Sequence, residues 1–355
     1  PSFSNLSDTV KQQIVEYIKT ISPAFKNAQP PQAIPDPKNL KAKPDLKKGA
    51  EVFAKLQCAL CHGQNGRANG TSAFTLLDAW QRPIRPADLT EGWTYRGGAR
   101  PIDVYHRILA GIDGAPMPSY EGAITHEEVW ELANYVASLQ LPANFSGEVV
   151  AERVSGDLPA AANDAAWKSA PMTMVNMQNF LYGKDGKRQR MTVNAVAVQA
   201  LFNDKGVAFK LGWDDPTKST GTAPDQILLA TKPLDYHGEP RGNLLNLYDA
   251  KDALDFTLWK AWHPEIVTRS TASIGDAVRA GWGGTQNPAA GEYDDGRWTV
   301  VFKRDFDEKS DAIRDNKSRA RIGFAAWDGS DDETGLRYSA SDWVWLDFGA
   351  PAGHH

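Results

Sequence analysis

The feature that most constrains this chain is its pair of cysteines. Cys58 and Cys61 are the only two in 355 residues, and His62 follows the second one directly. Two cysteines so close together cannot cross-link a fold of this size, which leaves a redox C-x-x-C motif, half of a zinc site or a haem attachment site. In C-x-x-C-H each thiol can form a thioether with a haem vinyl group while the adjacent imidazole ligates the iron. Because no second pair of Cys or His ligands is spaced for zinc, we predict one covalently bound c-type haem.

Two amphipathic segments frame the motif. Residues 47–56 place their apolar side chains on one stripe and predict a short helix that leads into Cys58. Thr125 and Glu128 form a capping-box pattern in front of residues 129–139, whose apolar positions also have helical spacing. The sequence therefore predicts a helix before the motif and another at the end of the same domain.

This arrangement resembles the class I cytochromes c, and the resemblance covers residues 46–141. It implies an all-α domain and a second axial ligand on a loop downstream of His62. Met117 lies between two prolines and matches the family's G-x-x-M-P pattern, with simple packing as its alternative role. His/Met ligation raises the reduction potential relative to His/His and leaves no open position on the iron. In this family the last helix crosses the first where a glycine faces an aromatic residue, and Gly49 and Tyr135 occupy those places.

The N-terminal segment repeats the end of this domain. Residues 1–22 align with residues 118–139, and the match is clearest between 14–21 and 132–139. We therefore expect residues 1–22 to be the terminal helix of an upstream cytochrome c domain, with a second haem, in a longer protein. An incidental amphipathic helix is the alternative.

Changes in composition mark the remaining boundaries. Residues 23–45 contain six prolines and few large apolar side chains, which is typical of a stiff, extended linker. A short Pro- and Gly-containing stretch, residues 142–147, ends the cytochrome domain. We place a further domain at residues 148–350.

The periodicity of this further domain is that of strands. Residues 191–198 and 207–213 alternate in polarity around a turn at 203–206, which predicts a hairpin. Later runs with strand composition are residues 297–302, 322–327 and 343–348. Several strands joined by long loops predict an antiparallel β-sandwich.

The sandwich carries a second resemblance. Residues 213–216 (Trp-Asp-Asp-Pro), 258–261 (Leu-Trp-Lys-Ala) and 325–329 (Ala-Ala-Trp-Asp-Gly) are similar to the γ-subunit domain of ethylbenzene dehydrogenase and related molybdenum oxidoreductases. The resemblance implies a haem b held between a methionine and a lysine. It also implies electron exchange with an iron–sulfur subunit of a molybdenum enzyme complex.

The haem b ligands of that family do not carry over to this sequence. Residues 236–254, where the family has its methionine, contain none, and Arg337 stands near the place of the lysine. Arginine stays protonated and has no lone pair to give to iron. Substitutes are His237, Lys260 and His263, each with an ordinary structural role as its alternative. Without a haem b, the sandwich would be a docking module that kept the fold and lost the cofactor.

These features predict an electron-transfer subunit rather than an enzyme, because no Ser/His/Asp set, carboxylate pair, phosphate loop or open metal site is apparent. The partners expected are iron–sulfur and molybdenum subunits or another redox protein. A net charge of −5 gives no footprint for nucleic acid, and no apolar run is long enough to span a membrane. A c-type haem indicates a periplasmic or other extracytoplasmic location.

Two other functions are compatible with the sequence. The sandwich is also compatible with a carbohydrate-binding or partner-binding module, in which tryptophans would stack on sugar rings. A peroxidase-like haem enzyme is the second of these functions, and it would require Met117 to leave the iron.

Met172 and Met174 share one face of an expected strand. Ordinary core packing and a Cu(I) site are the two interpretations of this pair.

Overall fold

The computed structural model describes most of the chain and divides it into two compact units, Pro1–Ala42 and Lys43–His355. The described residues are 5–21, 23–25, 34, 37, 43–178, 180–182, 188–232, 254–261, 263, 265–271, 274–279, 285–306 and 319–349. None of the described helices is both long and apolar enough to cross a bilayer.

The first unit contains helix α1, Asp8–Ile21, and a 3₁₀ turn, Pro23–Phe25. Asp8 in the first turn and Lys19 in the last complement the helix dipole. The helix buries none of its residues, so its apolar stripe is exposed. It lies where the sequence predicts a terminal helix, whereas its origin in an upstream domain stays a prediction. Most of the linker predicted at 23–45 falls outside the described residues.

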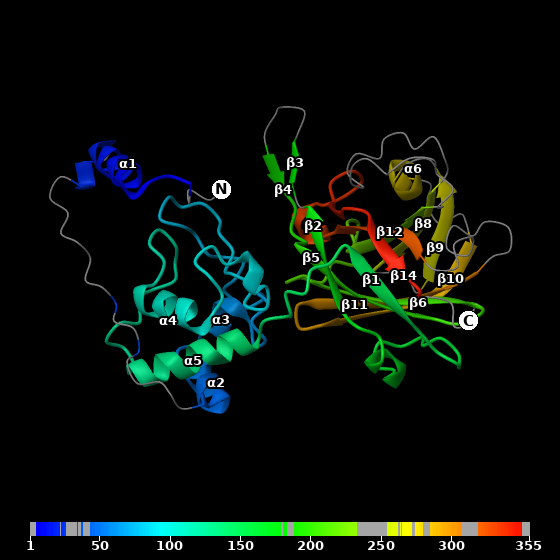
Figure 1. Cartoon of the computed structure of the whole chain (residues 1–355), viewed down its shortest axis with the longest axis horizontal. Coiled ribbons are helices and arrows are strands. Elements are labelled where there is room, and N and C mark those ends of the chain that lie inside the picture. The colour runs from blue at the N-terminus through cyan, green and yellow to red at the C-terminus, as the bar shows by residue number, and fades with distance from the viewer. Residues whose placement is uncertain are drawn as a thin grey trace. The chain divides into compact units, whose positions relative to one another are not determined.

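The helical part of the second unit holds four helices (Figure 1). They are α2 (Leu46–Lys55), α3 (Ala59–His62), α4 (Pro101–Ala110) and α5 (His126–Ser138). Helix α2 starts where the Asp45 carboxylate accepts hydrogen bonds from two backbone amides of the first turn, at 3.0 and 3.3 Å. The predicted capping box opens α5: Thr125 Oγ1 accepts from the Glu128 amide at 3.2 Å, and the Glu128 carboxylate accepts from the Thr125 amide at 3.0 Å.

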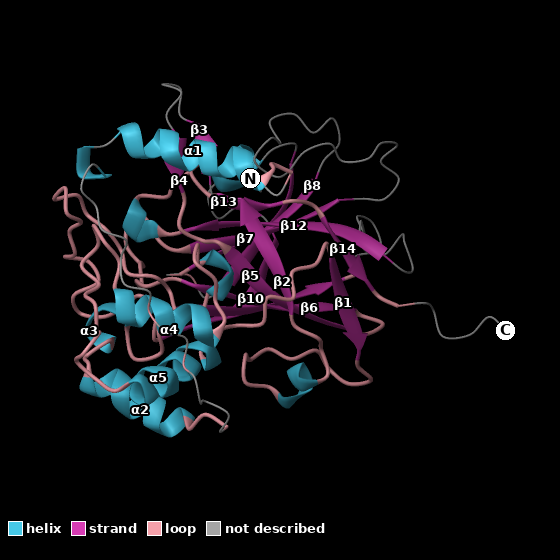
Figure 2. Ribbon diagram, turned by 60° about the vertical axis from the view of Figure 1, so that its left-hand side comes forward, coloured by secondary structure: helices cyan, strands magenta, loops and turns pink. Residues whose placement is uncertain are grey.

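Helices α2 and α5 cross in contact at Gly49 (Figure 2). A Cβ atom at Gly49 would lie 2.3 Å from the carbonyl oxygen of Glu131 and 2.6 Å from Cβ of Tyr135. The rings of Phe53 and Tyr135 then meet edge to face with centroids 5.5 Å apart. Only glycine permits this approach, so the crossing predicted from Gly49 and Tyr135 is present.

The rest of the second unit is a mixed β-sheet domain. Its strands are β1 (Glu148–Arg153), β2 (Thr173–Gln178), β3 (Phe180–Tyr182), β4 (Arg188–Arg190), β5 (Ala195–Phe202), β6 (Gly206–Asp214), β7 (Gln226–Lys232), β8 (Leu254–Lys260), β9 (Glu265–Thr271), β10 (Thr285–Asp294), β11 (Arg297–Asp305), β12 (Arg319–Trp327), β13 (Ser339–Ser341) and β14 (Val344–Asp347). A short helix, α6 (Ile274–Arg279), follows β9. Among the described strands, β3 and β4 form a separate two-stranded sheet (Figure 1).

Two rows of strands form the predicted sandwich. One row is β2-β5-β6-β11-β10, the other is β14-β12-β7-β8-β9, and every pairing within these rows is antiparallel. β1 differs from the antiparallel prediction, because its first half runs parallel to β14 and its second half parallel to β5. β10 likewise pairs with β9 through its first half and with β11 through its second. Strands that change partners in this way close the edges of the two rows.

The predicted hairpin exists with a shifted first strand. β5 runs from Ala195 to Phe202 rather than over residues 191–198, and the turn is held by Asn203 Oδ1, which accepts from the amides of the next residues at 2.8 and 3.1 Å. The Thr192 amide donates to the Glu333 carboxylate at 2.7 Å, and backbone bonding to β2 begins at Asn194, whose carbonyl accepts from the Met177 amide at 2.9 Å. The hydrogen bond to Glu333, which is far away in the chain, diverts the segment before it enters the sheet.

The sandwich interior is filled by large apolar side chains from both rows. Trp213 and Trp298 stack at a centroid distance of 6.3 Å, and Trp259 packs edge-on against both. Arg304 and Asp255 form an ion pair in this domain, each about one-tenth exposed, and Arg304 also donates to Thr231 Oγ1 at 2.8 Å. Met174 is buried in an apolar cluster and Met172 is partly buried against the same cluster, so the interpretation of these two methionines as core residues agrees with their surroundings.

Candidate functional site

The second unit contains a cavity of about 880 Å³ that reaches the C-x-x-C-H motif. Cys58, Cys61, His62 and Met117 all line it. Much of the remaining wall in the helical part is apolar: Phe53, Leu76, Leu89, Val104, Ile108, Leu132 and Val136. A cavity of this size and lining is suited to a large, flat, mostly apolar cofactor. The structure therefore brings together the four residues that the sequence singled out for a haem c.

The motif is wound into one helical turn. The Cys58 carbonyl accepts from the amides of Cys61 and His62 at 3.2 and 2.9 Å, which fixes the spacing of the two sulfur atoms. Neither cysteine is in a disulfide. Burial, assisted by Cys61, raises the pKa of the Cys58 thiol to about 11. Reactive thiols of redox C-x-x-C motifs have lowered pKa values, so the environment of Cys58 does not resemble such a site.

His62 is oriented by a backbone hydrogen bond. Its Nδ1 lies 2.8 Å from the carbonyl oxygen of Ala87, and because a carbonyl can only accept, Nδ1 carries the proton. Burial lowers the pKa of the imidazole, while the hydrogen bond to Ala87 opposes that shift. The ring is thus held neutral with the lone pair on Nε2, the form in which histidine binds a metal.

The loop that carries Met117 is fixed by its neighbours in sequence. The Met117 carbonyl accepts from the Ile112 amide at 3.0 Å. Gly111 has a φ of +69°, and a Cβ there would lie 2.6 Å from the Ser119 amide nitrogen. A side chain at Gly111 would therefore displace the loop, which ties the position of Met117 to the end of α4.

The sandwich completes the cavity wall, which the sequence did not predict. Its contribution comes from three segments: Met191, Thr192 and Asn194; Asp214, Pro216 and Thr217; and Asp328, Ser330 and Asp331. Met191 is fully buried and offers a second thioether at the same cavity. The one sequence signal for this contribution to the cavity wall is that two of these segments overlap the Trp-Asp-Asp-Pro and Trp-Asp-Gly motifs, which resemble the γ-subunit domain of ethylbenzene dehydrogenase.

The two parts are joined beside the cavity by a tight turn between β10 and β11. Asp295, at the tip of this turn, accepts hydrogen bonds from Asn65 and from Asn69, the latter at 2.8 Å. Arg67 Nη1 donates to the Asp295 carbonyl at 3.1 Å, and its Nε lies 3.5 Å from the buried Asp214 carboxylate. The loop that follows the haem motif is thus attached to the sandwich by charged and polar contacts.

Replacing Asp295 by asparagine should weaken this attachment by about 2 kcal/mol, because an amide nitrogen would face one of the two asparagine donors. Asparagine tolerates the positive φ of +40° at this position, so the turn itself should persist. Urea unfolding followed separately by haem absorption and by tryptophan fluorescence measures the effect. The matched control is Asp294→Asn, since Arg67 contacts only the Asp294 carbonyl. Equal stability of both variants would contradict the assigned role of Asp295.

Asp88 is a strongly perturbed carboxyl of the helical part that lines the cavity. Burial raises its pKa to about 7, and the charge of Asp214 adds to this, while hydrogen bonds from Thr90 and the charge of Arg67 act in the opposite direction. Thr90 Oγ1 lies 2.7 Å from both the Asp88 and the Asp214 carboxylate. The negative charge of the neighbouring Asp214 carboxylate therefore opposes the ionisation of Asp88.

This arrangement predicts a pH dependence of stability. The folded-state pKa of Asp88 lies above the value of about 3.9 expected on unfolding, so its contribution to stability is complete below that value and is lost as pH rises towards about 7. In Asp88→Asn we expect the decline in unfolding free energy between these limits to be smaller than in the wild type by a few kcal/mol. Urea titrations at several pH values, with exposed Asp113→Asn as control, measure this slope. An unchanged slope in Asp88→Asn would refute the prediction.

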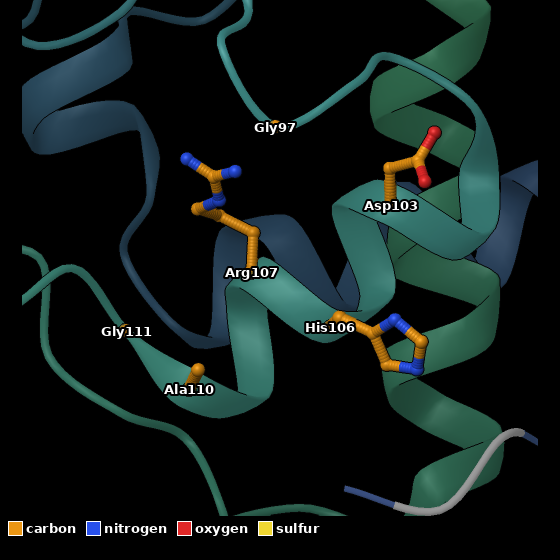
Figure 3. Close-up of a pocket in the computed structure, with 6 residues that line it drawn as sticks. All are labelled: Gly97, Asp103, His106, Arg107, Ala110 and Gly111. Atoms are coloured by element: carbon orange, nitrogen blue, oxygen red, sulfur yellow. The ribbon is translucent and has the colours of Figure 1, made fainter. Parts of the chain in front are cut away.

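A smaller hollow lies beside α4 (Figure 3). Arg107 reaches toward the loop at Gly97, whereas Asp103 and His106 point in other directions, so these groups do not converge on one point. His126, the other histidine of this region, has its Nδ1 2.5 Å from the Tyr105 hydroxyl and its Nε2 3.8 Å from the Glu121 carboxylate. Both histidines lie on helices, and neither is among the residues lining the large cavity.

Two of the three haem b candidates, Lys260 and His263, lie in the described part of the chain. Lys260 ends β8, and its carbonyl accepts from the His263 amide at 3.0 Å. His263 Nδ1 lies 4.0 Å from the Glu265 carboxylate. His237 lies outside the described residues. The ligands of a haem b therefore stay a prediction.

Comparison with known protein families finds a match for the helical part. Residues 44–136 match the family model of cytochrome c oxidase, cbb3-type, subunit III. The chain thus contains a cytochrome c domain followed by a β-sandwich, as the sequence predicted. A protein of Haloferax mediterranei that bears the name respiratory nitrate reductase heme subunit is 25% identical over 227 residues, which are 61% of this chain and 79% of that protein.

Two solved structures are also similar to parts of the chain. A reducing HAO-like protein complex of Kuenenia stuttgartiensis is 34% identical, with a TM-score of 0.36, over 39% of this chain and 64% of that one, so less than two thirds of that relative's length is spanned. A family 9 carbohydrate-binding module of Caldicellulosiruptor kristjanssonii in complex with glucose is 8% identical, with a TM-score of 0.34, over 59% of this chain and 98% of that one.

The family match and the C-x-x-C pair, Cys58 and Cys61, imply one haem c. The chain is a haem c electron-transfer protein, distantly related to the Haloferax heme subunit. Like other c-type cytochromes, it has the features of an electron carrier. Proteins of this type are typically extracytoplasmic.

Proposed function

We propose that this protein is the haem-carrying electron-transfer subunit of an extracytoplasmic molybdenum oxidoreductase complex. It would relay single electrons between an iron–sulfur subunit and a soluble or membrane acceptor. The observation that carries this proposal is the single cavity that gathers the C-x-x-C-H motif and Met117 in one place and closes them off with the sandwich.

Within that cavity each residue has a distinct task. Cys58 and Cys61 would hold the haem through two thioethers, and His62 would ligate the iron through Nε2, with its ring fixed by Ala87. Met117 would fill the opposite axial position, so that no coordination site is left for a substrate. A bound haem c supplies a reversible one-electron centre; the protein supplies its ligands, an apolar enclosure and polar partners at the rim.

The proposed partner class has two supports. The Haloferax relative is named as the heme subunit of a respiratory nitrate reductase. The sandwich carries the three segments that resemble the γ-subunit domain of ethylbenzene dehydrogenase, and two of them lie at the cavity wall. That the sandwich also holds a haem b is a separate proposal. Extraction of non-covalently bound haem from the protein tests it.

Burial of the tryptophans bears on the alternative of a carbohydrate-binding sandwich. Sugar binding by stacking needs exposed rings. In the described part of the sandwich, Trp167, Trp213, Trp259, Trp298, Trp327 and Trp343 are all less than 9% exposed. Trp345 is partly exposed, but Arg321 lies over its ring at 3.6 Å. Trp262 and Trp282 lie outside the described residues. The described rings thus favour electron transfer over sugar binding.

Native affinity purification from the source organism tests the proposed assembly. The purified protein should bring with it stoichiometric molybdenum and acid-labile sulfide, and the partner's substrate should reduce or oxidise the haem within the complex. A chain that purifies with its haem but without either component, and that binds oligosaccharide columns instead, would overturn the proposed partner and favour the binding-module alternative.

A further inference from the structure

Three carboxylates meet inside the sandwich next to the haem cavity. Asp215, Asp225 and Asp328 are 1%, 0% and 2% exposed, and one oxygen from each lies within 4.8 Å of the others. Asp215 follows β6, Asp225 precedes β7 and Asp328 follows β12. The fold thus brings three distant acidic residues to one end of the sandwich.

Two of the carboxylates are fixed in place by hydrogen bonds. Asp225 accepts from the amides of Ser219 and Gly329, at 2.7 and 2.9 Å, and from the indole of Trp298 at 2.9 Å. Asp328 Oδ1 accepts from the Ser330 amide and hydroxyl at 2.9 and 2.7 Å. These donors orient the groups without bringing any positive charge to them.

Asp215 is different because one of its oxygens has no partner. Its Oδ1 accepts from the amide and hydroxyl of Thr217 at 3.0 and 3.1 Å. Its Oδ2 is fully buried and has no hydrogen-bond partner among the residues that the structure describes. Leaving a buried carboxylate oxygen unpaired costs free energy that native structures normally avoid. The second oxygen of Asp215 therefore indicates a missing ligand at the cluster.

The negative charge of the cluster also indicates a missing ligand. Among the described residues, no lysine or arginine forms an ion pair with Asp215, Asp225 or Asp328, although Asp214 next to them pairs with Arg297 at 2.6 Å. Several buried carboxylates without a cation repel one another and lose their hydration. A cation bound among them would remove both penalties.

We propose that Asp215, Asp225 and Asp328 bind one Ca²⁺ ion. Three carboxylates form a hard, oxygen-only donor set, which suits Ca²⁺ or Mg²⁺ rather than a transition metal. Ligand oxygens on opposite sides of Ca²⁺ are about 4.8 Å apart, whereas Mg²⁺ demands shorter bonds and retains several waters. The three oxygens lie within 4.8 Å of one another, so one ion can reach all of them, and the burial of the site leaves little room for the waters that Mg²⁺ retains, so it fits Ca²⁺ better.

Calcium here would fix the sandwich side of the haem cavity. Asp328, Pro216 and Thr217 belong to or adjoin the cluster and also line that cavity. The ion would hold the segment after β6 and the segment after β12 together, and with them the surface against which the haem packs. This role is independent of how the haem is ligated and of which partner receives the electron.

Calcium binding to the holoprotein tests the proposal. After treatment with a chelator, equilibrium dialysis against CaCl₂ should show one equivalent bound per chain. The melting temperature, followed by circular dichroism, should rise by about 5 °C when free Ca²⁺ exceeds its dissociation constant about a hundredfold. The haem absorption should stay unchanged, and Mg²⁺ at the same concentration should raise the melting temperature less. No bound calcium, or an equal effect of Mg²⁺, would overturn the assignment.

Asp215→Asn provides the matched variant. It should weaken calcium binding at least tenfold, while its melting temperature without calcium should be no lower than that of the wild type, since a repelling charge is removed. Asp305→Asn, an exposed carboxylate of the same domain, should bind calcium like the wild type. If Asp215→Asn fails to fold, Asp328→Asn serves the same test. Undiminished calcium binding in the variant that folds would contradict the site.

Discussion

Replacing Met117 by alanine should open the haem iron to an external ligand and lower its reduction potential by on the order of 0.1 V. The reduced wild-type protein should not bind carbon monoxide, because its sixth position is filled, whereas the reduced variant should bind it. The ferric variant should also lose the weak charge-transfer absorption that a methionine ligand gives. Optical titration with carbon monoxide and a potentiometric titration measure both effects.

Met191 is the matched control because it offers a second thioether to the same cavity from the sandwich side. Met191→Ala should lose about 2 kcal/mol of stability or more, since its side chain is fully buried, but should keep the potential and the resistance to carbon monoxide. If Met191→Ala bound carbon monoxide and Met117→Ala did not, the sandwich would supply the axial ligand. If the wild type bound it, the peroxidase-like alternative would regain weight.

Replacing Gly49 by alanine should destabilise the helical part by about 3 kcal/mol. Helix propensity alone predicts the opposite sign, because alanine is favoured over glycine in a helix by about 1 kcal/mol. The added Cβ would lie 2.3 Å from a backbone oxygen of α5, which cannot rotate out of the way as a side chain would. Chemical unfolding followed by haem absorption measures the difference in free energy.

The control for Gly49 is Gly147→Ala. A Cβ at Gly147 meets nothing within 4 Å, so this variant should be as stable as the wild type or slightly more stable. A Gly49→Ala protein that is stabilised by the amount that helix propensity predicts would show that α2 and α5 do not approach as closely as the structure has them.

Local patterns predicted the helical part well. The capping box at Thr125 and the stripe of residues 47–56 each depend on residues close in sequence. The crossing at Gly49 and Tyr135 was expected from the resemblance to class I cytochromes c. The hairpin of β5 and β6 was also predicted, but not its start, because the hydrogen bond from Thr192 to Glu333 joins residues far apart in the chain. Such a competing contact leaves no trace in local periodicity.

The sandwich side of the cavity and the acidic cluster were beyond local patterns. Asp215 and Asp328 belonged to motifs that supported a family resemblance, yet nothing in their spacing showed that they meet each other and Asp225. Likewise, Met191 stood at the edge of an alternating run and gave no sign that it faces a haem cavity. Contacts between strands that change partners, such as β1, depend on the assembled sheet.

The central claim is that this chain carries one covalently attached haem that exchanges one electron. A pyridine haemochrome spectrum of the purified protein, recorded before and after acid–acetone extraction and followed by a potentiometric titration, tests it most directly. We predict one haem c that resists extraction and a titration that follows a single one-electron Nernst curve. Extractable haem in addition would show that the sandwich holds a haem b, in accordance with its resemblance. Protein without any unextractable haem would contradict the claim.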